Sequence, residues 1–322
     1  MPSYSGVWTL TAVYQAVGAG NWPLPPLSGD IGLFAGGATA SNTNVIQYIS
    51  IASTGNAIDF GDLTVARVRL TSCASTTRGV FSGGTVSGAR TNIIDYVTII
   101  STGNAIDFGD LLSPANFLGG ASNTTRGIFF GGRSDAADYS NVIQYITIAT
   151  TGNATDFGDL TLARADLASC ASSTRAISGG GSIDGAVLQN IIDYVTIATT
   201  GNATDFGDLT VARQYLASCS SSTRGLFGGG TVSPVSNIID YVTIASTGNA
   251  TDFGDLTQAR AELAACSSST RGVFGGGERT GGNSNVMDYV TIGTTGNATD
   301  FGDLLSETYG IAGCSNSGGG VQ

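Results

Sequence analysis

Short runs of apolar residues alternate with polar, glycine-containing turns along the whole chain. In one representative stretch, residues 238–244 alternate apolar residues around Tyr241, and residues 216–220, 225–228 and 250–256 form three more short runs of small or apolar residues. A period of two predicts half-buried β-strands. The turns between them contain Gly and Asn, which supply the positive φ of tight hairpins. No connection is long enough for a crossover helix, so antiparallel sheets are expected.

This group of four strands is repeated. A tyrosine recurs every 47 to 49 residues, and a phenylalanine follows each one after 12 residues. The tyrosines are Tyr48, Tyr96, Tyr145, Tyr194, Tyr241 and Tyr289. Four antiparallel strands at this period predict an all-β fold, a six-bladed β-propeller. A solenoid is the alternative, but it needs end caps, and the repeats run nearly to the C-terminus.

The ends of the repeat array predict how the ring closes. Nothing before Gly32 resembles the first strand of a blade, whereas Cys314 follows Phe301 as Cys73 follows Phe60, after 13 residues. Residues 310–315 are therefore expected to form the missing strand of blade one, which removes an open sheet edge. The predicted organisation is an N-terminal segment, residues 1–30, followed by the propeller, residues 31–322.

Charge and composition exclude several functions. The formal net charge is −11, and the chain contains no His and no Lys. An acidic chain without basic clusters is a poor ligand for nucleic acid and is repelled by anionic membranes. No apolar run reaches the length of a membrane span, and the N-terminus lacks the pattern of a signal peptide. Without His, a copper-radical oxidase and a serine hydrolase are excluded, and sialidase motifs are absent. We expect a protein that is not an enzyme and holds no cofactor or metal.

Two repeated motifs have both a structural and a ligand-binding interpretation. Cysteines occupy one place in the first strand of five blades, at Cys73, Cys170, Cys219, Cys266 and Cys314, with Ala121 in the sixth. They are interpreted as small buried thiols; a metal-binding ring is the alternative. Asp-Phe-Gly-Asp occurs six times, as at residues 59–62. Calcium binding needs more oxygen ligands than two carboxylates, so we expect turn and edge hydrogen bonds, with pairing to the arginine that follows each first strand.

The repeats resemble the kelch family. The apolar stretch and glycine pair at residues 33–37 and 80–84, followed by the tyrosine, is similar to the kelch pattern across residues 31–318, although Phe stands where kelch repeats have Trp. The resemblance implies a kelch-like propeller. It implies no activity, because the family includes enzymes, scaffolds and adhesins.

Residues 1–30 differ from the repeats and contain both tryptophans, Trp8 and Trp22. They are interpreted as an anchor, with a plug packed on the propeller as the alternative. The start of this segment and the Thr-Gly-Asn-Ala-Thr-Asp-Phe-Gly-Asp repeats resemble structural proteins of aquatic, cyanophage-type bacteriophages. That resemblance implies a virion component (a fibre, tail or head decoration) assembled in the host cytoplasm and attached to other virion proteins through residues 1–30. The alternatives are a structural module without a ligand, and a carbohydrate- or protein-binding kelch scaffold outside a virion.

Variation between the repeats predicts a binding face. In a four-stranded blade, the connections between the second and third strands and between successive blades share one face. Those connections vary, whereas the turns on the other face are nearly constant. Variable loops on a rigid scaffold usually carry function, although drift on an unconstrained face would look the same. The residues expected to bind a host glycan or surface protein are Arg69, Arg133, Tyr139, Tyr215 and Arg279. Their replacement by alanine is expected to leave stability nearly unchanged.

Overall fold

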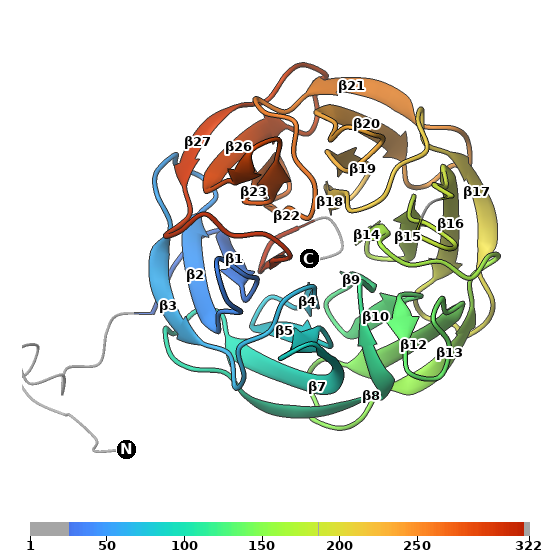
Figure 1. Cartoon of the computed structure of the whole chain (residues 1–322), viewed down its shortest axis with the longest axis horizontal. Helices are drawn as coiled ribbons and strands as arrows, with labels where there is room; N and C mark the ends of the chain where they lie inside the picture. The colour runs from blue at the N-terminus through green and yellow to red at the C-terminus, as the bar shows by residue number, and fades with distance from the viewer. Residues whose placement is uncertain (1–25, 186, 319–322) are drawn as a thin grey trace, which may run out of the picture.

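A ring of six antiparallel sheets makes up the computed structural model, which describes residues 26–185 and 187–318 (Figure 1). The described residues contain strands and turns but no helix. Each blade has a four-residue strand beside the central axis and its last strand in sequence order on the rim, except that blade one takes its axial strand from the C-terminus, so the predicted six-bladed β-propeller is confirmed. The predicted anchor residues Trp8 and Trp22 lie outside the described residues.

The strands of each blade follow the predicted order from the axis outwards. Blade one consists of β28 (Ala312–Ser315), β1 (Ile31–Ala35), β2 (Val45–Ser50) and β3 (Ile58–Asp62). Blade two consists of β4 (Thr71–Ala74), β5 (Arg78–Ser82), β7 (Ala89–Thr98) and β8 (Ile106–Asn116). Blade three consists of β9 (Gly119–Ser122), β10 (Arg126–Phe130), β12 (Val142–Thr147) and β13 (Thr155–Asp159).

The remaining blades repeat the arrangement. Blade four consists of β14 (Ala168–Ala171), β15 (Arg175–Gly179), β16 (Ile191–Thr196) and β17 (Thr204–Asp208). Blade five consists of β18 (Ala217–Ser220), β19 (Arg224–Gly228), β20 (Ile238–Thr243) and β21 (Thr251–Asp255). Blade six consists of β22 (Ala264–Ser267), β23 (Arg271–Gly275), β26 (Val286–Thr291) and β27 (Thr299–Asp303).

The C-terminal strand closes the ring. β28 pairs antiparallel with β1, with Cys314 opposite Leu33, so blade one combines strands from both ends of the array. On the rim, the backbone N–H of Asp303 in blade six donates to Oδ1 of Asn56 in blade one, 3.1 Å away. Closure at the axis and at the rim leaves no sheet edge open between the first and last blades, as predicted.

The Asp-Phe-Gly-Asp strands join each blade to the next through their backbones. The N–H of Gly103 donates to Phe60 O and that of Ala105 to Asp62 O. A Cβ on Gly109, which has φ +147°, would lie 2.5 Å from the carbonyl oxygen of Gly152 in the next blade. Only glycine fits such a close approach, and the same contact at every junction explains why the glycine of the motif is present in all six copies.

The predicted partner of the Asp-Phe-Gly-Asp carboxylates was wrong. Each arginine that follows a first strand stacks on the tyrosine of its own blade and donates to a backbone carbonyl of the next blade. Arg175, for example, lies 4.3 Å from the Tyr194 ring centroid and donates to Ile244 O at 2.9 Å. The tyrosine face attracts the cation, so the guanidinium is already occupied.

All five cysteines are buried, as the structural interpretation predicted. Their sulfurs pack between blades: a Cβ on Gly225 in blade five would lie 2.8 Å from Cys170 Sγ in blade four. Where blade three has Ala121 instead of cysteine, blade four has Ala176 instead of glycine, and both belong to one apolar cluster. Within residues 26–185 and 187–318, no group of three or more Cys, Asp or Glu side chains is arranged to hold a metal ion.

Candidate functional site

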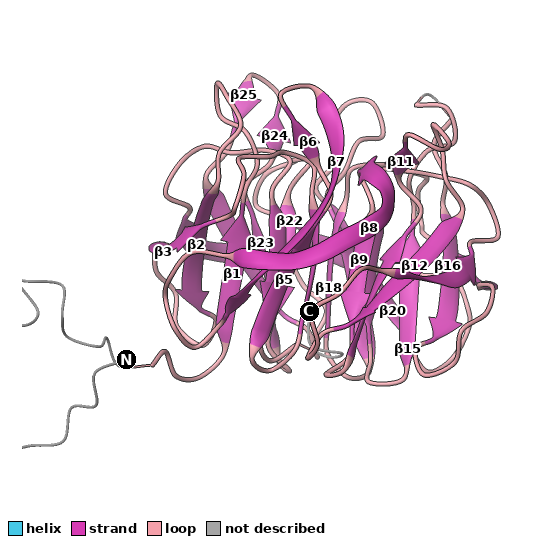
Figure 2. Cartoon of the chain, turned by 90° about the horizontal axis from the view of Figure 1, so that it is seen from below, coloured by secondary structure: helices cyan, strands magenta, loops and turns pink. Residues whose placement is uncertain are grey.

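The variable connections meet on one face of the ring, here called the loop face. Isolated β-bridges join each of five inter-blade connections to the loop between the second and third strands of the following blade, as between Val68 and Thr85 and between Ala261 and Glu278. Figure 2 shows the short strands β6 (Thr85–Val86), β11 (Arg133–Ser134), β24 (Glu278–Arg279) and β25 (Gly282–Asn283) on this side. The predicted grouping of these connections on one face is confirmed.

Six equivalent residues form a closed ring of backbone hydrogen bonds around the axis on this face. Each N–H donates to the carbonyl oxygen of the residue in the preceding connection, over 2.7 to 3.1 Å. The members are Arg69, Phe117, Asp166, Tyr215, Glu262 and Gly310. Each adopts a positive φ, between 50° and 64°. Glycine favours this region, and a large side chain there costs of order 1 kcal/mol or more. Five large side chains at such positions indicate a functional site, because strain of this kind concentrates at such sites.

The side chains of the ring pair with one another and with the neighbouring loops. Arg69 donates through Nε and Nη2 to both carboxylate oxygens of Glu262, at 3.1 Å each. Arg133, in β11, donates to Oδ2 of Asp166 at 3.1 Å. The Ser182 hydroxyl also donates to that oxygen, at 2.9 Å. Paired donors and acceptors therefore surround the opening of a central cavity of about 120 Å³.

Aromatic rings hold the two arginines in place. The guanidinium of Arg69 lies 4.8 Å from the Phe117 ring centroid and that of Arg133 lies 5.2 Å from it. Arg133 also lies 5.1 Å from the Tyr139 ring, and Tyr215 packs 5.4 Å from Phe117. Stacked guanidiniums lose little freedom when they bind a further group, so the site is organised in advance.

Burial changes the ionisation of the acidic groups. Burial raises the pKa of Asp166, and Arg133 and Ser182 offset only part of that effect. Burial also raises the pKa of Glu262, with Arg69 acting in the opposite direction. Burial, helped by Asp166, raises the pKa of the Tyr215 phenol to about 12. Tyr215 is therefore a neutral hydrogen-bonding group at physiological pH.

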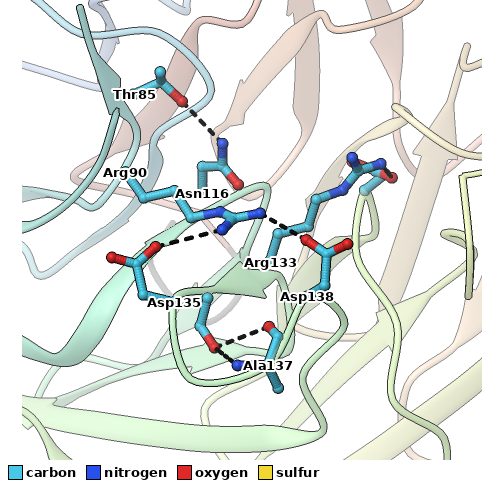
Figure 3. Close-up of polar contacts among 9 residues, drawn as sticks. Thr85, Arg90, Asn116, Arg133, Asp135, Ala137 and Asp138 are labelled. Atoms are coloured by element: carbon cyan, nitrogen blue, oxygen red, sulfur yellow. Dashed lines mark hydrogen bonds and ion pairs between the residues drawn. The ribbon is translucent and has the colours of Figure 1, made fainter. Parts of the chain in front are cut away.

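A groove of about 520 Å³ lies beside the ring, between blades two and three. Its polar lining includes Arg90, Asn116 and Arg133 (Figure 3). The Asn116 side chain donates through Nδ2 to the Thr85 hydroxyl at 2.8 Å, and Arg90 bridges Asp135 and Asp138 at 3.3 and 2.7 Å. This volume lies within the range of about 300 to 1,000 Å³ typical of small-molecule sites.

Four of the five residues predicted to bind a ligand lie together. Arg69 and Tyr215 belong to the ring around the axis with Phe117, Arg133 stacks on Phe117, and Tyr139 contacts Arg133. Arg279 lies on the same face, exposed in β24, and does not line the groove or the central cavity. Their roles in binding stay predictions.

The expectation that these side chains are dispensable for stability stays a prediction, but the structure argues against it for Arg133. Its partner Asp166 has a fully buried side chain, so removal of Arg133 would leave a buried carboxylate unpaired.

Sequence reasoning missed the partners Phe117, Asp166 and Glu262 and the groove residues Arg90 and Asn116. The first three share one position of the repeat with Arg69 and Tyr215, immediately before the apolar residue that precedes the innermost strand. The predicted residues are all aromatic or arginine. That criterion omits Asp166 and Glu262, the two carboxylates that pair with the arginines.

Neither a protein-family model nor a curated protein matches this chain. The described part of the chain contains no helix with the length and apolar character needed to cross a membrane. The structure defines the fold class as a six-bladed β-propeller. Because no family model or curated protein matches, the kelch and bacteriophage resemblances remain hypotheses from the sequence.

Proposed function

We propose that the protein is a non-enzymatic display module of a bacteriophage virion, in a fibre, the tail or a head decoration. The loop face attaches to the host surface, at a glycan or protein, or to neighbouring virion proteins, and residues 1–30 join the propeller to the particle. The alternative is a carbohydrate- or protein-binding scaffold outside a virion, which would use the same face.

The observation that carries the proposal is that Leu27, close to the start of the described residues, and the candidate site lie on opposite faces. The N–H of Leu27 donates to Ile100 O at 2.7 Å, in the turn between the last two strands of blade two. This turn belongs to the face opposite the loop face. A module held through residues 1–30 would therefore point its variable loops away from the attachment point.

The apolar surface near this exit supports a contact with another protein. Ile58, Ile100 and Ile106 are exposed by 55%, 39% and 57%. The other four blades have Thr at the positions of Ile58 and Ile106, and the other five have Ala or Gly at the position of Ile100. At these positions exposed isoleucines occur only in the two adjacent blades one and two, which favours a partner there over a requirement of the fold.

The pairing of charges supports a binding role over catalysis. The chain has no His, and the two buried carboxylates beside the central cavity, Asp166 and Glu262, each pair with an arginine. A general acid or base needs a proton that it exchanges with substrate, whereas these groups fix the positions of guanidiniums.

Incorporation into particles tests the proposal. Deletion of residues 1–26 should leave the propeller folded, shown by an unchanged thermal transition, but should abolish incorporation into virions. Replacement of the half-buried Tyr139 by serine should leave incorporation intact and weaken adsorption to host cells. Normal incorporation of the shortened chain would contradict the anchor, and surface binding by a protein absent from particles would favour the scaffold outside a virion.

A further inference from the structure

The arginines of this chain fall into two groups: those that recur in the repeats and stabilise the framework, and those that have no counterpart in the repeats. All 13 basic residues are arginines. Four are buried in ion pairs between blades, such as Arg213 with Asp240, and five stack on the repeated tyrosines, such as Arg175 on Tyr194. The other four have no counterpart in the repeats, and three of them, Arg69, Arg90 and Arg133, line the one groove.

Charges in and around the groove are close to balanced. Arg69 pairs with Glu262, Arg133 with Asp166, and Arg90 with Asp135 and Asp138. A ligand anion would have to compete with these carboxylates, and a cation would meet three guanidiniums. A neutral ligand with many hydroxyls breaks no ion pair, because each hydroxyl both donates and accepts hydrogen bonds.

Buried polar atoms at the groove lack partners. Asn116 is 8% exposed, and while its Nδ2 is held by Thr85, its Oδ1 has no hydrogen-bond partner among the described residues. Nε of Arg133, which also lines the groove, is likewise without a partner there. A buried polar group is normally hydrogen-bonded, so the groove offers an acceptor and a donor to a bound molecule.

We propose that this groove binds a neutral saccharide unit through its ring hydroxyls. Oδ1 of Asn116 accepts a hydrogen bond from one hydroxyl of the sugar. The guanidiniums of Arg90 and Arg133 donate hydrogen bonds to the oxygens of neighbouring hydroxyls. The stacking of Arg133 on Phe117 and Tyr139 holds its donors in place before the sugar arrives. The inference rests on the proposed function, since it assigns the ligand class of the loop face.

Binding of defined polysaccharides to the full-length protein tests this site. Dextran, mannan and galactan serve as neutral probes, and dextran sulfate and polygalacturonate as charged counterparts, with affinity measured by calorimetry. At least one neutral probe should bind, and Asn116→Ala and Arg90→Ala should each weaken that binding about tenfold or more. The matched control is Gln214→Ala, which changes an amide of equal burial at the same repeat position outside the groove.

The outcomes separate this inference from the proposed function. Loss of neutral-sugar binding in Asn116→Ala and Arg90→Ala, with thermal transitions and Gln214→Ala unchanged, supports the saccharide site. Preference for the charged probes, no binding of neutral probes, or equal binding by all variants overturns it. If adsorption to host cells persists in the same variants, the display function stands while the saccharide site fails; if the wild-type protein adsorbs to no host surface, the surface-attachment role fails as well.

Discussion

Arg213 and Asp240 form an ion pair across the interface of blades four and five, with Nη2 and Oδ2 2.8 Å apart and neither side chain exposed. Thr210 donates its hydroxyl to the same carboxylate at 2.5 Å. Equivalent buried pairs occur at three other interfaces, between Arg67 and Asp95, Arg164 and Asp193, and Arg260 and Asp288.

At the two remaining blade interfaces, the threonine, the arginine and the aspartate are all replaced by other residues. Where blade three has Gln144 in place of the aspartate, the preceding connection has Leu112 and Ala115 in place of the threonine and arginine, and Leu112 N donates to Gln144 Oε1 at 2.9 Å. Blade one makes a similar exchange, with Leu305 and Thr308 in place of the threonine and arginine and with Gln47 accepting from Leu305 N at 2.8 Å. The residues of each arrangement occur together because a buried charge without its partner destabilises the protein more than either complete arrangement does.

Replacement of Arg213 by alanine should therefore lower the free energy of unfolding by about 3–5 kcal/mol, since it leaves Asp240 buried without its cation. The triple variant Thr210→Leu, Arg213→Ala, Asp240→Gln copies the set found at Leu112, Ala115 and Gln144 and should recover most of the loss. Denaturant unfolding measures both. A triple variant as unstable as the single one would show that the sets are not interchangeable.

Gly225 and Cys170 should be coupled across their interface. Gly225→Ala brings a methyl group against Cys170 Sγ and should destabilise the protein by about 1–3 kcal/mol. Adding Cys170→Ala makes room, as in the natural pair Ala121 and Ala176, so the double variant should lose less than the sum of the single changes. Strict additivity in a double-mutant cycle would contradict the packing account.

Loss of the closing strand should destabilise the whole ring. Deletion of residues 306–322 removes β28 and should cost several kcal/mol, a large share of the stability of a typical domain. Deletion of residues 317–322 is the matched control, because it leaves β28 and the bond from Ile31 N to Asn316 Oδ1 in place. Equal melting temperatures for the two shortened chains would show that β28 does not close the ring.

The pH dependence of stability should report the burial of Asp166. Its pKa is raised in the folded protein above 3.8, so the folded state holds that proton more tightly than the unfolded state. Its contribution to the free energy of unfolding should thus fall as pH rises from 3.8 and level off once the folded carboxyl has ionised. The difference in stability between the wild type and Asp166→Asn should decline in that range. A difference that grows with pH would show that Arg133 outweighs burial.

The thiols should be unreactive in the folded protein. All five cysteines are buried, and burial raises the pKa of Cys314 to about 12. Because the thiolate is the reactive form, Ellman's reagent at pH 8 should modify no thiol until denaturant is added, and then all five. Rapid reaction of the native protein would place a cysteine on an accessible surface.

The amino-acid sequence by itself determined the framework of this protein. Strand alternation around residues such as Tyr241, the near-constant repeat period and the displaced Cys314 strand depend on local spacing, which a single chain displays directly. The grouping of variable connections on one face followed from strand direction alone. These features were predictable because five blades are built from contiguous residues, and the strand that completes blade one keeps the spacing of the repeat.

Only the tertiary structure decided which side chains meet between blades. Arg213 reaches Asp240, Arg133 reaches Asp166, and Arg69 spans to Glu262, although no local pattern links these residues. The repeated arginines do not pair with Asp-Phe-Gly-Asp for the same reason. Each guanidinium stacks on a tyrosine and donates to a backbone carbonyl of the next blade. Contacts between blades depend on how neighbouring sheets pack around the axis, and that geometry brings Asn116 beside Arg90 and Arg133 at one groove.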